Sequence, residues 1–312
     1  MVLYIDKENL VSLVQSKNKG EFAEYAALIR KNLDVQYNFR KEEIKEDEYL
    51  KYWFNTIIQG VGESKQEFCP PKDIIPEIPR KSNFYNSLPS SDRSSIFFFN
   101  DERKASVAEA KCCVIVSKVG DEMSKLRELY SFEEKGEILA YEIQNWSSYL
   151  PHLPLTDIII CDNHYFKDKY VYDTNDNELI RYLSSIPQQI PVNVVIIAKE
   201  GEIDPAIDLS KEQESIKAIV KAASGSAKST VTIVTTYKNH DRALITNYYR
   251  VNHGSCFHLK KNNLKHDVKT EVKTHGMRKN HSFTKKLLAE YQDVISTPSK
   301  CIGDKVSNIL VF

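Results

Sequence analysis

Five polar residues around position 250 have types and spacing that could serve phosphate chemistry: His240, Arg242, Asn247, Gly254 and Ser255. As a pattern they read H-x-R-x4-N-x6-G-S. His240 and Arg242 are two residues apart, so on an extended strand both side chains point to the same face. A histidine can act as a nucleophile or general acid, and an arginine can bind two phosphate oxygens through its planar guanidinium. The pattern therefore predicts a phosphate-facing set of side chains.

This pattern resembles the signature of the phospholipase D-like superfamily, H-x-K-x4-D followed six residues later by G-S. Arg242 stands where the family has Lys, and Asn247 stands where it has Asp. The stretch IIICDNHYF at 158–166 resembles the D-P-Y segment of one branch, the phospholipase D-like domain found C-terminal to MIT domains. That domain is also degenerate and is regarded as a non-enzymatic, membrane-associating module. The resemblance covers residues 105–312.

In active members of the superfamily, two such motifs meet at one site. One histidine attacks phosphorus, the other protonates the leaving group, the lysine holds phosphate oxygens and the aspartate orients the histidine. The resemblance assigns catalytic roles to His240, Arg242 and Asn247, and phosphate binding to Arg242, Gly254 and Ser255. Asn247 carries no charge to stabilise an imidazolium, and an analogous Asp→Asn change in serine proteases lowers kcat by about 10^4. Phosphate binding should therefore survive these changes more readily than turnover.

The sequence contains one copy of the pattern, because the other H-x-K pair, His258 and Lys260, has Lys265 where the aspartate would stand. We therefore expect a degenerate, non-catalytic module that binds a phosphate group, a polyanion or a partner protein. The alternative is a metal-independent phosphodiesterase or nuclease, with a defence effector as one such role. It would be a homodimer in which two copies of His240 face each other. A regulatory or scaffolding protein in which the pattern is accidental is a third interpretation.

The sequence gives weaker indications of a metal site or of an acid–base site. A strand over residues 2–5 ends in Asp6, with Asn9 three residues later, an opening that resembles metal-dependent ribonuclease domains of the PIN-like class. Such sites need several carboxylates around a divalent cation, and no later strand in residues 1–100 ends in a matching aspartate. We therefore expect Asp6 to begin a helix over 7–15. We also expect Asp162 to be a strand-end cap or ion-pair partner, and we expect no metal and no cofactor.

Apolar patterns predict two domains. Residues 1–104 read as a small α/β module with a proline-rich connection at 68–93. Residues 105–312 alternate strands and helices, which predicts an α/β sandwich of the phospholipase D-like type, a mixed sheet flanked by helices. The predicted strands of this domain are 112–117, 156–161, 192–198, 231–235, one that contains His240, 255–259 and 306–312; the predicted helices include 121–129, 175–185, 211–223 and 283–291.

The net charge and the composition limit the classes of partner that the chain could bind. The chain of 312 residues has 43 basic and 43 acidic residues, so no global attraction to nucleic acid or anionic membranes is implied. The segment 260–286 is rich in Lys and Arg, and with His240 and Arg242 it is the expected contact for nucleic acid or an anionic lipid head group. The first domain would recruit a partner protein. With no signal peptide, no long apolar run and no C-x-x-C pair, we expect a cytoplasmic protein without a transmembrane segment.

Overall fold

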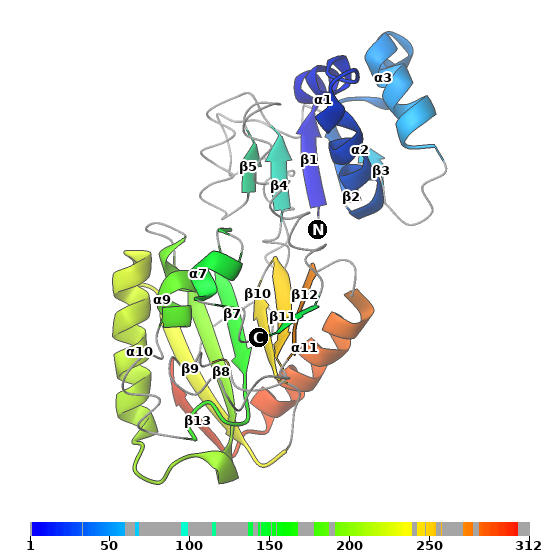
Figure 1. Cartoon of the computed structure of the whole chain (residues 1–312). Helices are drawn as coiled ribbons and strands as arrows, with labels where there is room; N and C mark the ends of the chain where they lie inside the picture. Colours follow the sequence, from blue (N-terminus) through cyan, green and yellow to red (C-terminus); the bar gives the residue numbers. More distant parts are fainter. Residues whose placement is uncertain are drawn as a thin grey trace. The chain divides into compact units, whose positions relative to one another are not determined.

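The structure is a computed structural model of a chain that divides into two compact units, Met1–Ser131 and Phe132–Phe312 (Figure 1). It describes residues 2–32, 34–59, 66–68, 95–98, 114–116, 137–139, 143, 145–150, 152–153, 155–167, 178–186, 191–238, 242–246, 248–253, 257, 271–276 and 281–304. None of the helices in these ranges is long and apolar enough to cross a membrane.

The first unit contains a five-stranded sheet in which every neighbouring pair of strands is parallel. Its order is β3-β2-β1-β4-β5. The strands are β1 (Val2–Asp6), β2 (Asp34–Asn38), β3 (Gln66–Phe68), β4 (Ser95–Phe98) and β5 (Val114–Val116). Helices α1 (Lys7–Gln15) and α2 (Gly20–Asn32) carry the chain from β1 to β2, because parallel neighbours need a long crossover. Strand β4 then lies on the other side of β1, so the direction of winding reverses there.

Aromatic side chains fill one part of the core of the first unit. Tyr37, Phe39, Phe54 and Phe68 lie with ring centroids 4.9 to 6.3 Å apart. The Trp53 Nε1–H donates to the Tyr37 hydroxyl at 2.9 Å, and burial raises the pKa of Tyr37 well above 10.0. These rings join β2 and β3 to the π-helical segment η2 (Trp53–Ile57). Two short helical segments, η1 (Lys41–Lys45) and α3 (Glu48–Tyr52), precede η2 in the chain.

The second unit contains an eight-stranded mixed sheet in the order β13-β9-β8-β7-β10-β11-β12-β6. Three central strands, β7 (Asp157–Cys161), β8 (Asn193–Lys199) and β9 (Thr230–Thr236), are parallel. The other pairings are antiparallel. These outer strands are β6 (Glu137–Leu139), β10 (Ala243–Thr246), β11 (Tyr249–His253), β12 (Glu271–Gly276) and β13 (Lys300–Gly303). β-Branched and other apolar residues make β7 and β8 almost wholly buried strands, as expected for parallel strands covered on both faces.

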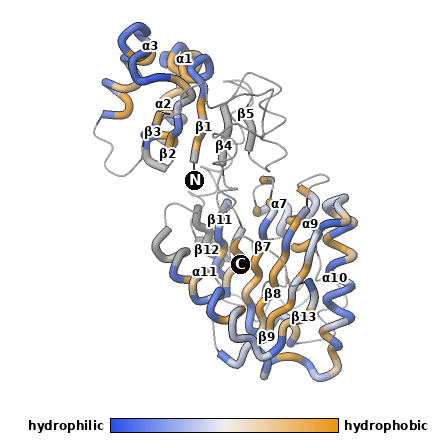
Figure 2. Tube along the Cα trace, turned by 180° about the vertical axis from the view of Figure 1, so that it is seen from behind, coloured by the Kyte–Doolittle hydropathy of each residue, from blue (hydrophilic) through white to orange (hydrophobic). Residues whose placement is uncertain are grey.

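Helices cover both faces of this sheet, with α11 on one side and α9 and α10 on the other (Figure 1). Their bounds are α9 (Glu178–Ser185), α10 (Leu209–Ser224) and α11 (His281–Ser296). Leu287, Tyr291 and Val294 of α11 pack against alternate residues of the sheet, among them Ile159 and Val195. Figure 2 shows the central strands largely in orange, whereas hydrophilic (blue) and hydrophobic (orange) residues alternate along α10. The expected mixed sheet flanked by helices is therefore confirmed.

Several elements differ from the sequence prediction. Strand β5 pairs with β4 in the first sheet, so the first unit extends to Ser131 and not to the expected boundary at residue 104. Strands β12 and β13 were not foreseen, and Phe257 lies in a bend within the predicted strand 255–259. The strand expected to contain His240 and Arg242 begins only at Ala243, so Arg242 precedes it, and His240 lies outside the described residues. The proline-rich connection after Phe68, the helix predicted at 121–129 and the strand predicted at 306–312 lie outside the described residues.

Candidate functional site

The carboxyl ends of the parallel strands β7, β8 and β9 meet at one edge of the second sheet. Because β10 is antiparallel to β7, with Ala243 opposite Cys161, the start of β10 lies at this same edge. Strand β11 returns to it, since Asn252 pairs with Ala243. Asp162 directly follows β7 and Arg242 directly precedes β10, so the register brings these two residues together. In open α/β sheets the carboxyl edge is the usual place for ligand sites.

Asp162 is fully buried and its carboxylate faces several partners. Oδ1 accepts the backbone N–H of His164 at 2.9 Å, and Oδ2 accepts that of Phe257 at 3.0 Å. The Nε of Arg242 lies 3.6 Å from Oδ1. A buried carboxylate is tolerated only when its charge is paired and its oxygens are hydrogen-bonded. The expectation that Asp162 is a strand-end cap and ion-pair partner is thus confirmed.

Arg242 is partly exposed, with 22% of its side chain accessible to solvent. Its backbone carbonyl accepts the N–H of His253 at 3.4 Å, which holds the residue beside the end of β11. The buried carboxylate of Asp162 fixes one side of the guanidinium. This ion pair places the positive charge of the guanidinium beside the end of β7. The arrangement can therefore present an oriented cation at the sheet edge.

A second group of charges joins the loop that follows Asp162 to the turn that follows β8. Glu202, in the 3-10 turn η6 (Glu200–Glu202) after β8, has its Oε2 3.3 Å from His164 Nδ1 and 3.2 Å from Lys167 Nζ. Burial is the largest cause lowering the pKa of His164 below 6.5, with the charges of Arg242 and Lys167 acting in the same direction. His164 is therefore held mainly neutral at pH 7, and the edge carries two cations, Arg242 and Lys167, beside two carboxylates.

Aromatic residues pack around Phe257, whose backbone N–H donates to the Asp162 carboxylate. The indole N–H of Trp146, in the short helix α7 (Trp146–Tyr149), donates to the carbonyl of Phe257 at 3.1 Å. The rings of Trp146, His253 and Phe257 all contact one another, with centroids 5.4 to 6.0 Å apart. The sequence prediction assigned no role at the site to Trp146, His253 or Phe257. His253 directly precedes the predicted Gly254-Ser255 pair, and this adjacency is the one sequence indication of its place.

The structure places only part of the predicted phosphate-facing set. Arg242 is described, whereas His240, Asn247, Gly254 and Ser255 lie outside the described residues. Within the described part of the chain, no group of three or more His, Cys, Asp or Glu could hold a metal ion. Part of the basic segment 260–286 forms β12 and the start of α11.

In the first unit, Asp6 lies at the carboxyl end of β1 and begins α1. Its Oδ1 accepts the backbone N–H of Asn9 at 2.9 Å, which is a helix N-cap. The expected helix start is therefore confirmed. Strands β2 and β4 flank β1, so Asp6 also lies at the point where the winding of the sheet reverses. Such switch points are where doubly wound sheets bind ligands.

No model of a known protein family matches the sequence, and no curated protein matches it. One solved structure that resembles part of the chain is TrmBL2, an archaeal chromatin protein whose structure is described as showing a novel mode of DNA binding. The match covers 55% of this chain and 49% of that chain at 14% identity, with a TM-score of 0.26. At this TM-score the likeness establishes neither a shared fold nor a shared function.

Replacing Asp162 by alanine should lower the free energy of unfolding by about 3 kcal/mol, because two buried N–H groups and the Arg242 guanidinium lose their partner. Urea unfolding monitored by circular dichroism measures this change. Asp293→Ala is the matched control, since Asp293 pairs with Lys238 at an exposed position and should change the stability little. Equal stabilities of the two variants would contradict the anchoring role of Asp162.

The lowered pKa of His164 predicts a pH dependence. The unfolded chain binds a proton at His164 more tightly than the folded chain, so this contribution to stability is present above pH 6.5 and is lost as the pH falls towards the lower folded pKa. His164→Gln should therefore lose less stability than the wild type between neutral and mildly acidic pH. Urea midpoints of both proteins across that range test this, and identical slopes would refute it.

Proposed function

We propose that the second unit is a degenerate phospholipase D-like module that binds a phosphate-bearing ligand without hydrolysing it. The observation that carries this proposal is the guanidinium of Arg242, held by the buried carboxylate of Asp162 at the carboxyl edge of the sheet. A pre-oriented guanidinium matches two phosphate oxygens at once. Lys167 supplies a second cation on the neighbouring loop.

The charges at this edge favour a discrete phosphate over a long polyanion. Arg242 and Lys167 are balanced by Asp162 and Glu202, so the local field is not strongly positive. A single oriented phosphate contact needs no such field, because its strength comes from hydrogen-bond geometry. Turnover is disfavoured by the asparagine at 247 and by the single copy of the motif. A general-acid or nucleophilic histidine would lack its carboxylate partner.

Arg242→Gln should weaken the binding of a phosphate-bearing probe by about tenfold, as for the loss of one bidentate contact. Fluorescence anisotropy with labelled single-stranded DNA and RNA, and calorimetry with inorganic phosphate, measure this loss. Arg181→Gln is the matched control, because Arg181 is exposed on α9 and should leave the affinity unchanged. Equal affinities of the Arg242 variant and the wild type would refute the proposed contact.

The same protein preparation tests the catalytic alternative. Hydrolysis of a chromogenic phosphodiester, DNA or RNA that disappears in His240→Ala would overturn the non-catalytic proposal. It would favour the homodimeric phosphodiesterase or nuclease, in which two copies of His240 form one site. Light scattering decides whether the protein is a dimer, and a monomer without hydrolysis supports the binding module.

A second function, ribonuclease activity of the first unit, is supported by the place of Asp6. The carboxylate lies at the switch point of an all-parallel sheet, at the end of the strand that resembles the PIN-like opening. Among the described residues, the buried side-chain amide nitrogen of Asn9 has no hydrogen-bond partner. One carboxylate does not make a magnesium site, and the described residues show no group of three metal ligands, so we derive no metal-dependent step.

Asp6→Asn separates this function from helix capping, because asparagine caps a helix as well as aspartate does. If the first unit cleaves RNA through the Asp6 carboxylate, the variant should lose cleavage of labelled RNA while its thermal unfolding midpoint stays unchanged. Cleavage that persists in the variant would exclude a role for the Asp6 carboxylate. A wild type without cleavage leaves recruitment of a partner protein as the role of the first unit.

A further inference from the structure

His164 lies beside the guanidinium that is proposed to bind phosphate. Oδ1 of Asp162 accepts the backbone N–H of His164 at 2.9 Å and lies 3.6 Å from the Nε of Arg242. One oxygen of a fully buried carboxylate therefore holds both residues. The two residues consequently keep a fixed relation at this edge of the sheet.

The carboxylate of Glu202 faces one nitrogen of the imidazole. Its Oε2 lies 3.3 Å from Nδ1 of His164. That nitrogen is buried and its contact with Glu202 is not aligned as a hydrogen bond, whereas the side chain as a whole is 29% exposed. The negative charge beside Nδ1 favours the tautomer with the hydrogen on this nitrogen, which leaves a lone pair on Nε2. Neutral His164 can therefore accept a proton at Nε2 but cannot donate a hydrogen bond from it.

Four charged groups act on the imidazole. Burial is the largest cause that lowers the pKa of His164, and the charges of Arg242 and Lys167 lower it further. The charges of Glu202 and Asp162 act in the opposite direction. Because the two cations and the two carboxylates cancel, this group has no net charge while His164 is neutral. Protonation of His164 gives the group one net positive charge.

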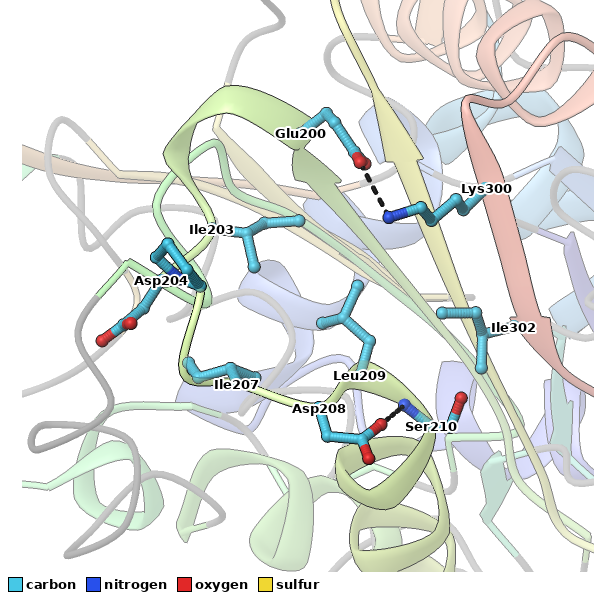
Figure 3. Close-up of a pocket in the computed structure, with 10 residues that line it drawn as sticks. Glu200, Ile203, Asp204, Ile207, Asp208, Leu209, Ser210, Lys300 and Ile302 are labelled. Carbon is cyan, nitrogen blue, oxygen red and sulfur yellow. Dashed lines mark hydrogen bonds and ion pairs between the residues drawn. The ribbon is translucent and has the colours of Figure 1, made fainter.

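The other glutamate of the turn η6 does not take part in this group. Glu200 pairs with Lys300 of β13, whose Nζ lies 3.0 Å from Glu200 Oε1 (Figure 3). Glu202 keeps its own charge in acid, because a hydrogen bond from Lys167 is the largest cause that lowers its pKa. Glu202 therefore remains a carboxylate while His164 titrates.

We propose that His164 is a second contact of the phosphate-bearing ligand and that the protonated imidazole makes this contact, so that ligand binding takes up a proton from solvent. The inference rests on the proposed function, because it requires an anion at Arg242. An anion beside an imidazole favours the imidazolium, which has an N–H on both nitrogens. Nε2 can then donate to a phosphate oxygen. By linkage, the affinity for the ligand rises as the pH falls through the titration range of His164.

Calorimetric titration of the whole chain with sulfate tests the proposal. Sulfate keeps its double negative charge between about pH 8 and about pH 6, whereas a phosphate monoester gains a proton near the lower end of this range. The affinity for sulfate should be about tenfold higher at the lower pH, which is a coupling of ordinary strength. Titrations in two buffers of different ionisation enthalpy should show a net uptake of protons by the protein.

His164→Gln should lose both the rise in affinity and the proton uptake, because glutamine does not titrate. His152→Gln is the matched control, since His152 is exposed and its ring contacts Tyr182, and it should keep both. The ring resonances of His164, assigned by their absence from the spectrum of His164→Gln, give a direct measurement on the wild type. Sulfate should raise the pKa that they report.

An affinity for sulfate that does not depend on pH, or a dependence that His164→Gln retains, would overturn the inference. If Arg242→Gln still weakens sulfate binding in that case, the proposed phosphate contact stands and only the role of His164 fails. If Arg242→Gln binds sulfate as the wild type does, or if the wild type does not bind sulfate at millimolar concentration, the phosphate contact fails and the inference fails with it.

Discussion

The organisation of the second unit depends on the buried carboxylate of Asp162. Its oxygens join the end of β7 to the backbone of Phe257 and to the side chain of Arg242. A carboxylate that is buried away from water needs hydrogen bonds or an opposite charge in place of its lost hydration. We therefore expect these contacts to form together and to be lost together. The same compensation that stabilises the strand end also orients the guanidinium. The structural role of Asp162 and the proposed phosphate contact of Arg242 therefore depend on one ion pair.

Sheet geometry concentrates chemistry at the carboxyl edge of this unit. The two glutamates at the ends of the turn η6 make ion pairs with different elements of the unit. On one side Glu202 contacts His164 and Lys167, next to the guanidinium proposed to bind phosphate. On the other side Glu200 pairs with Lys300 of β13. The two glutamates of this short turn thus pair with lysines from different elements, Lys167 of the loop after β7 and Lys300 of β13.

In the first unit, too, the carboxyl ends of parallel strands share one edge, but different side chains lie there. The described strands of its sheet are all parallel, so their carboxyl ends share one edge. Asp6 occupies the central position of that edge and caps α1. In the second unit the antiparallel strands β10 and β11 bring additional side chains, Arg242 and His253, to the edge. Mixed pairing therefore adds side chains from antiparallel strands to the carboxyl edge of the second unit.

The sequence by itself determined the elements that local patterns encode. Runs of β-branched residues predicted β7, β8 and β9, and Asp6 predicted the start of α1, because strand burial and helix capping depend on neighbouring residues. Only the tertiary structure decided that β5 joins the first sheet, that β13 pairs with β9, and that Asp162 meets a backbone N–H 95 residues away. Strand partners and register are set by packing between distant segments, and no local pattern specifies them.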